Sequence, residues 1–174
     1  MSEPNYPHLD KNKPYPLAGI LVIDFTHVLS GPTCSRMLAD AGARVIHVER
    51  KTGDDTRHMG PYLADGSSEY FRICNTGKES IALDLKNAQD HALAEKMIAK
   101  ADVVVENFRP GVMTRLGFDP EEMVKKYPKL IFASISGFGQ YGPFEAGETE
   151  RDAARREVFE EVGLKPEFDF DFHE

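Results

Sequence analysis

Short apolar runs alternate with more polar, amphipathic stretches along most of this chain. The runs occupy residues 18–25, 44–49, 80–85, 103–105 and 130–135. Continuous apolar runs of this length are typical of strands that are buried on both faces of a sheet. Because a helix-like stretch separates successive strands at several points, the pattern predicts an α/β fold built on a doubly wound, mostly parallel sheet.

Three of the predicted helices begin at recognisable start signals. Pro32 suits the first turn of a helix over residues 32–42, and Asn87 can cap a helix over residues 87–101. Asp119 precedes a proline and two acidic residues, which is the usual order at a helix start. Strand–helix–strand units of this kind connect parallel strands by right-handed crossovers, so the carboxyl ends of the strands are expected at one edge of the sheet.

The first residues of the chain differ from the body that follows. Residues 1–15 form a polar, proline-rich tail with no apolar segment of the kind found in secretory signals. No apolar run in the sequence reaches the roughly 18–20 residues that cross a bilayer. We therefore expect a cytoplasmic protein that makes no contact with a membrane.

The last residues differ from the body in charge. Residues 147–174 hold ten of the 29 acidic residues but four of the 21 basic ones, although the net charge of the whole chain is −8. This shift predicts a boundary near residue 145. A nearly neutral body with an acidic end also argues against a nucleic-acid partner, since phosphates require a basic face.

Polar side chains follow the predicted strands, where open α/β sheets bind their ligands. Arg50, Lys86 and Asn107 offer cations and amide donors of the kind that suit a phosphorylated ligand. No glycine-rich GxGxxG motif follows the first strand, which disfavours a nicotinamide cofactor. The alternative from spacing alone is that strand ends are polar because they meet water. Carboxylates at these ends, such as Asp24 and Glu106, are expected to make local hydrogen bonds.

Several motifs of the body keep the order and spacing of a known family. They include Asp24-Phe25-Thr26, Ser30-Gly31-Pro32, Val48-Glu49-Arg50, Gly53-Asp54-Asp55-Thr56-Arg57, Glu106-Asn107-Phe108-Arg109-Pro110-Gly111 and Ser136-Gly137-Phe138-Gly139-Gln140. Together they resemble the opening of the family III CoA-transferases, which include formyl-CoA transferase. The resemblance covers residues 16–144, and it implies a Rossmann-like, CoA-binding half in a family whose subunits interlock as dimers.

The resemblance also implies which residues contact coenzyme A. By position they are Leu29, Ser30, Arg50, Leu83, Lys86, Asn107, Phe108 and Arg115. Their chemistry is suitable, because cations can bind phosphates and apolar side chains can form walls. For Leu83 and Phe108, packing in the core is an alternative explanation.

The family's chemistry uses an aspartate nucleophile that attacks a thioester carbonyl. The resemblance places that residue downstream of the glycine-rich segment that ends near Gly142, where this chain diverges. We therefore assign no catalytic residue and expect CoA or acyl-CoA recognition with little turnover by the chain alone. A non-catalytic partner of a full-length transferase, or a homodimer, is the alternative expectation.

The end of the chain carries a second motif. Residues 142–164 are similar at every fixed position to the Nudix box, which marks Mg-dependent hydrolases of nucleoside diphosphate derivatives. Glu157, Glu160 and Glu161 would share one flank of a helix and offer carboxylates to Mg²⁺. We expect residues 145–174 to form a fused Nudix-box fragment, a helix–strand appendage with a strand at 167–172. The alternative explanation is a solvated acidic helix.

Overall fold

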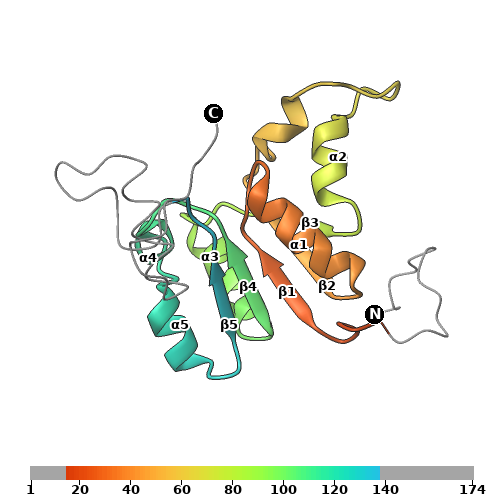
Figure 1. The fold of residues 1–174 in the computed structure, drawn as a ribbon. Helices are drawn as coiled ribbons and strands as arrows, with labels where there is room; N and C mark the ends of the chain where they lie inside the picture. Colours follow the sequence, from red (N-terminus) through yellow and green to blue (C-terminus); the bar gives the residue numbers. More distant parts are fainter. Residues whose placement is uncertain (1–14, 138–174) are drawn as a thin grey trace, which may run out of the picture. The chain divides into compact units, whose positions relative to one another are not determined.

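Five parallel strands form the sheet at the centre of the computed structural model, which describes residues 15–137 (Figure 1). The strands are β1 (Leu21–Asp24), β2 (Arg44–Glu49), β3 (Glu79–Ala82), β4 (Val103–Glu106) and β5 (Ile131–Ser134). Their spatial order is β3-β2-β1-β4-β5, and every pair of neighbours is parallel. The predicted α/β fold with a doubly wound parallel sheet is therefore confirmed.

The chain divides into a first unit, Met1–Ile135, and a second, Ser136–Glu174. The fold described here is that of the first unit. The predicted helix–strand appendage and its glutamates, Glu157, Glu160 and Glu161, lie outside the described residues. So do residues 1–14 of the predicted polar tail.

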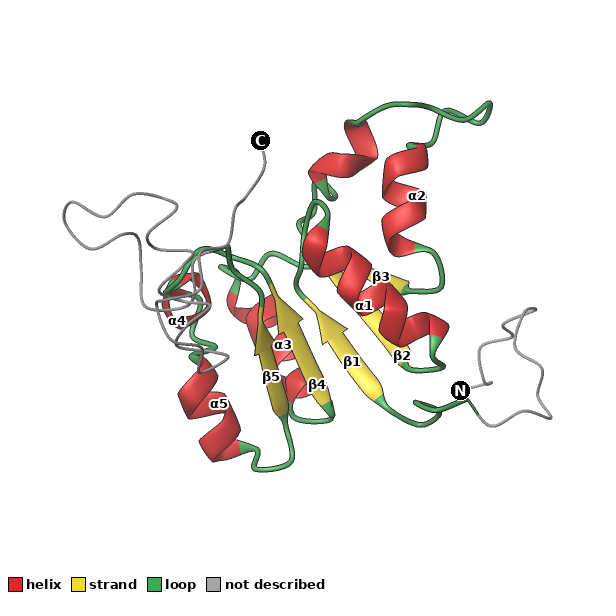
Figure 2. Cartoon of the chain, in the orientation of Figure 1, coloured by secondary structure: helices red, strands yellow, loops and turns green. Residues whose placement is uncertain are grey.

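Helices connect the strands and cover both faces of the sheet (Figure 2). They are α1 (Ser30–Asp40), the 3-10 helix η1 (Asp55–His58), α2 (Glu69–Asn75), α3 (Ala88–Ile98), α4 (Val112–Arg115) and α5 (Pro120–Lys126). Asn87 and Asp119 cap α3 and α5 as predicted, since each accepts hydrogen bonds from N–H groups of the first turn. The helix α1 begins at Ser30, so Pro32 lies in its first turn as predicted, and it ends at Asp40, two residues before the predicted end.

A separate apolar core lies on each face of the sheet. In one core, Ile23 of β1 and Val104 of β4 pack against the helices α3, α4 and α5. These helices contribute Ile98, Met113 and Met123. The other core packs the opposite side chains of β1, β2 and β4 against α1. Burial on both faces explains why the central strands β1, β2 and β4 are continuous apolar runs in the sequence.

The direction in which the chain adds strands reverses between β1 and β4. From β1 the chain proceeds outward through β2 to β3, and then crosses back to β4 and outward to β5. Such a reversal leaves a crevice beyond the carboxyl ends of the two central strands, where open α/β proteins bind ligands. No helix in residues 15–137 is long and apolar enough to cross a membrane.

Candidate functional site

A cleft lies along the carboxyl edge of the sheet, and we call it the carboxyl-edge cleft. Its larger lobe encloses about 510 Å³, and an adjoining smaller lobe encloses about 240 Å³. The two lobes share Phe25, Val48, Glu49, Arg50 and Phe108. The larger lobe is further lined by Lys51, Thr52, Leu83, Asp84, Leu85, Lys86 and Leu116. Its volume lies in the range of sites that hold small molecules and cofactors.

Four of the predicted CoA contacts come together in this cleft. Arg50 and Lys86 contribute cations from the ends of β2 and β3, and Leu83 and Phe108 contribute apolar surface. Leu83 also belongs to the core beneath the cleft, where it is 5% exposed. Leu83 therefore both packs in the core and lines the cleft.

The other four predicted contacts lie elsewhere. Leu29 stands at the start of α1 and is 53% exposed, with the exposed Ser30 beside it. Arg115 is exposed at the end of α4. None of these side chains lines either lobe of the cleft in the described part of the chain, and neither does Asn107.

Asn107 instead joins the loops that follow β1 and β4. Its amide oxygen accepts a hydrogen bond from the His27 N–H at 2.9 Å, and its amide nitrogen donates to the His27 carbonyl oxygen at 2.9 Å. The His27 ring in turn packs against Phe108, with the ring centroids 5.3 Å apart. Asn107 therefore fixes the loop that presents Phe108 to the cleft.

Three basic side chains line the rim of the larger lobe, and two of them are paired with acids. Arg50 Nη2 lies 2.7 Å from Asp55 Oδ1, and Lys51 Nζ lies 2.8 Å from an oxygen of Asp90. Lys86 makes no side-chain ion pair among residues 15–137. The rim thus combines one unpaired cation with two cations that are already partly neutralised.

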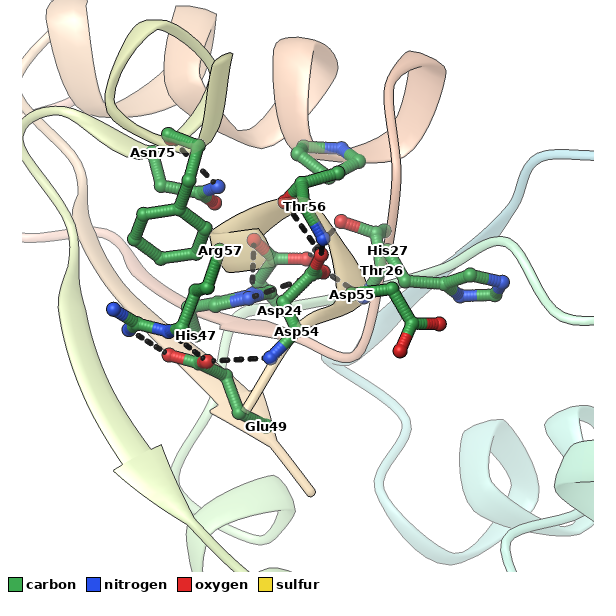
Figure 3. A network of polar contacts seen from close by, with 12 residues as sticks. Asp24, Thr26, His27, His47, Glu49, Asp54, Asp55, Thr56, Arg57 and Asn75 are labelled. Carbon is green, nitrogen blue, oxygen red and sulfur yellow. Dashed lines mark hydrogen bonds and ion pairs between the residues drawn. The ribbon is translucent and has the colours of Figure 1, made fainter. Parts of the chain in front are cut away.

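Glu49 anchors the wall of the smaller lobe (Figure 3). Its carboxylate accepts hydrogen bonds from both Nε and Nη2 of Arg57, from the Ser80 hydroxyl and from the Asp54 N–H. Burial raises the pKa of Glu49, but these donors outweigh burial and bring the pKa down to about 2. Because the Arg57 guanidinium also lies 3.7 Å from the centre of the Phe71 ring, Glu49 and Phe71 together fix the loop that carries Arg57.

Asp24 is the centre of a second buried polar cluster, behind this wall (Figure 3). One of its oxygens lies 3.0 Å from Lys78 Nζ, 3.2 Å from His47 Nδ1 and 2.6 Å from the Ser35 hydroxyl. The other accepts from the N–H and hydroxyl of Thr26. Burial by itself would raise the pKa of Asp24, but these contacts hold it well below its usual range. The expected local hydrogen bonding of this carboxylate is confirmed.

Lys78 is fully satisfied in this cluster. Besides Asp24, its ammonium donates to the Pro32 carbonyl at 2.9 Å and to the Asn75 side-chain oxygen at 2.8 Å. Burial lowers the pKa of Lys78 from its ordinary value, and the Asp24 carboxylate opposes that shift. The cluster therefore ties β1 to α1 and to the segment between α2 and β3, and it holds the sheet edge beneath the cleft.

Sequence reasoning missed most of the members of these two clusters. Asp24 and Glu49 were visible as strand-end carboxylates, but Lys78, Arg57 and His47 carry no local signal that points to them. Two of the partners are far apart in sequence, since His47 lies 23 positions and Lys78 lies 54 positions from Asp24, whereas Arg57 lies eight positions from Glu49. Parallel pairing of β1 with β2 brings His47 next to Asp24, whereas Arg57 comes from η1 and Lys78 from the segment between α2 and β3. No local pattern defines these placements.

The fold and the cleft define an open α/β protein with a cleft at the switch point of a parallel sheet, where such folds bind ligands. Residues 17–150 match CoA-transferase family III. The acetyl-CoA:oxalate CoA-transferase of Acetobacter aceti is 57% identical over 129 residues, and the formyl-CoA:oxalate CoA-transferase of Afipia carboxidovorans is 51% identical over 130. The crystal structure of a CAIB/BAIF family protein from Brucella suis is similar with a TM-score of 0.71 at 36% identity. The chain belongs to CoA-transferase family III.

The match spans a part of these relatives. It covers 74% of this chain but 33% of the Acetobacter aceti protein and 30% of the Afipia carboxidovorans protein. For the Brucella suis structure the shares are 93% of this chain and 44% of that chain. The chain thus spans about a third of the length of the curated relatives it matches.

The match with family III ends at residue 150, inside residues 142–164 for which a Nudix box is predicted. The fused fragment and its magnesium ligands, Glu157, Glu160 and Glu161, stay predictions, since they lie outside the described residues. Among the residues that the structure does describe, no group of three or more His, Cys, Asp or Glu side chains is arranged to hold a metal ion.

Proposed function

We propose that the carboxyl-edge cleft binds coenzyme A or an acyl-CoA thioester, and that the chain serves as the CoA-binding half of a CoA-transferase. The observation that supports this most is the meeting of Arg50, Lys51 and Lys86 at the rim of one cleft with apolar walls from Leu83 and Phe108. Cations suit the phosphates of the ligand, and apolar walls suit its base or its pantetheine arm.

The residues outside the cleft have a secondary place in this proposal. Ser30 and Leu29 lie at the start of α1, and Arg115 lies on α4. Coenzyme A is long enough to extend past a cleft of this size, so these side chains would meet the ligand at its ends. Asn107 would act through the loop that it fixes, because both ends of its amide are used by His27.

The proposed reaction is transfer of CoA between carboxylic acids. The two curated relatives are named for oxalate, with acetyl-CoA or formyl-CoA as the other substrate, so we propose short acids of this class. Within residues 15–137 the strand-end carboxylates are committed to hydrogen bonds, as in Asp24, Glu49 and Glu106. We therefore place no nucleophile among the described residues.

Calorimetric titration with CoA tests the binding proposal. The Lys86→Met variant should bind CoA about tenfold more weakly, which corresponds to ~1.4 kcal/mol. The matched control is Lys100→Met, because Lys100 is exposed and lies three positions before β4, whose amino end is at the opposite edge of the sheet. Equal affinities of the wild type, Lys86→Met and Lys100→Met would remove this cleft as the binding site.

A second candidate function rests on the match of residues 142–164 with the Nudix box. In this proposal Glu157, Glu160 and Glu161 bind Mg²⁺ for hydrolysis of a nucleoside diphosphate derivative. The test is hydrolysis of ADP-ribose with and without Mg²⁺. Activity that the Glu157→Gln variant retains in full would eliminate this candidate.

A third proposal concerns a protein partner. The family resemblance implies interlocked subunits, and the apolar side chains of Met37 on α1 and Ile73 on α2 are 67% and 55% exposed. We propose a homodimer, or pairing with a full-length transferase of the same family. Sedimentation at several concentrations tests the homodimer, and a monomer at all of them, with no association to added transferase, would contradict this proposal.

A further inference from the structure

The arginine that lines both lobes of the proposed CoA site already forms an ion pair with an acidic side chain. Arg50 lines both lobes of the cleft, and its guanidinium lies 2.7 Å from the carboxylate of Asp55. The two side chains are 66% and 63% exposed, so the pair stands at the mouth of the cleft. An incoming phosphate therefore meets an arginine whose charge is partly neutralised.

Asp55 lies in the first turn of η1, and Arg50 is its one side-chain partner among residues 15–137. Its side chain makes no other hydrogen bond or ion pair in the described part of the chain. The neighbouring Asp54 caps η1 by accepting from the Thr56 N–H, and Glu49 anchors the loop through Arg57. The conformation of the loop thus depends on Asp54 and Glu49. The carboxylate of Asp55 bonds to Arg50 and makes no other hydrogen bond or ion pair in residues 15–137 that would hold the loop.

The comparable pair at Lys51 differs in this respect. Its partner Asp90 also accepts a hydrogen bond from the Asp84 N–H at 2.9 Å. Removing that carboxylate would disturb the loop after β3 as well as the ion pair. Asp55 is therefore the acid whose effect on the ligand can be separated from its effect on the fold.

We propose that Asp55 is a specificity-determining residue of the CoA site, an internal counter-ion that a phosphate group of the ligand displaces from Arg50. The inference rests on the proposed function, because it requires that the cleft binds CoA. Arginine forms two parallel hydrogen bonds with a phosphate, which suits exchange of Asp55 for a ligand that carries several negative charges. An anion with a weaker charge competes less well with Asp55, so the cleft discriminates in favour of phosphorylated ligands.

The size of the effect follows from the exposure of the pair. Exposed ion pairs are weak, and breaking one changes an equilibrium constant by about twofold to fivefold. Loss of the competing carboxylate should therefore strengthen CoA binding by about that factor. The gain should depend on Arg50, because without Arg50 no guanidinium remains for Asp55 to occupy.

The test is calorimetric titration of CoA into the full chain and four variants. They are Asp55→Asn, Arg50→Met, the double variant, and Asp40→Asn as the control. Asp40 is also an exposed acid paired with an arginine, Arg36 at 3.4 Å, but it is at the end of α1 that faces away from the cleft. We expect Asp55→Asn to bind CoA about twofold to fivefold more tightly than the wild type, and Asp40→Asn to match the wild type.

In the Arg50→Met background, the Asp55→Asn change should shift the affinity by less than about twofold. The inference is overturned if Asp55→Asn binds CoA no better than the wild type, or if the same gain appears without Arg50 or in Asp40→Asn. Those results leave the proposed function intact, because the wild type still binds. Absence of CoA binding by the wild type and all variants would instead overturn the proposed function and the inference with it.

Discussion

The side-chain amide of Asn107 forms two hydrogen bonds with the backbone of one residue, His27. One runs from the His27 N–H to the amide oxygen and the other from the amide nitrogen to the His27 carbonyl, both at 2.9 Å. These two hydrogen bonds join the loop that follows β1 to the loop that follows β4, at the switch point of the sheet where the cleft lies. The resemblance to family III implies that Asn107 contacts CoA, which stays a prediction, and its two hydrogen bonds with His27 fix the loop next to Phe108.

Replacing Asn107 should therefore reduce stability as well as ligand binding. The Asn107→Leu variant leaves the backbone groups of His27 without a partner, and we expect a loss of about 2 kcal/mol in the free energy of unfolding. Asn107→Asp keeps the acceptor for the His27 N–H and should lose less. Urea denaturation measures both, and a stability of Asn107→Leu equal to that of the wild type would contradict the role given to this amide.

The buried pair of Asp24 and Lys78 should be strongly coupled. In Asp24→Asn the buried ammonium of Lys78 loses its counter-ion, and we expect a destabilisation of about 3–5 kcal/mol. The double variant Asp24→Asn, Lys78→Met should lose less than the two single variants combined, because it no longer buries an unpaired charge. Denaturant unfolding of all three variants gives the coupling.

Asp40→Asn serves as the control for that series. Asp40 pairs with Arg36 in an exposed position, so its loss should cost less than about 1 kcal/mol. Strictly additive losses for Asp24 and Lys78 would mean that the two groups do not stabilise each other.

The lowered pKa of Glu49 should make the stability of the protein depend on pH. Its folded-state pKa of about 2 lies below the ordinary value of 4.5. A carboxyl group of this kind stabilises the fold above its unfolded-state pKa, and this contribution is lost as the pH falls toward the folded-state value. Between about pH 6 and about pH 3 the wild type should lose on the order of 2 kcal/mol more stability than Glu49→Gln. Thermal unfolding of both proteins across this range measures the difference, and parallel curves would contradict it.

The fold could be predicted from the sequence because its central strands, β1, β2 and β4, are buried on both faces. Val22 and Val45 face one core, whereas Ile23 and Val104 face the other, and this arrangement requires continuous apolar runs. Side-chain caps such as Asn87 and Asp119 marked helix starts correctly. The helix α2 and the shorter η1 and α4 were not predicted. The helices η1 and α4 have four residues each, which is too few for a periodic pattern of apolar residues.

The site could be predicted in part. Arg50 directly follows β2 and Lys86 lies in the loop after β3, so parallel pairing places both at the carboxyl edge. The partners that neutralise or anchor the cleft come from α3, as Asp90 does for Lys51, or from η1 after β2, as Arg57 does for Glu49. Those contacts depend on loop geometry after β2, which no local pattern specifies. For that reason the sequence indicated the ligand class but not the balance of charge at the rim.

The most direct test of the central claim is to locate the CoA site on the folded chain by nuclear magnetic resonance. Amide chemical shifts of the labelled protein would be followed during titration with CoA. We predict that the shifts change around Arg50, Lys86 and Phe108, at the carboxyl edge of the sheet, and that Arg44 and Lys100 at the opposite edge do not respond. Shifts that cluster away from the carboxyl edge, or a spectrum that CoA leaves unchanged, would contradict the account.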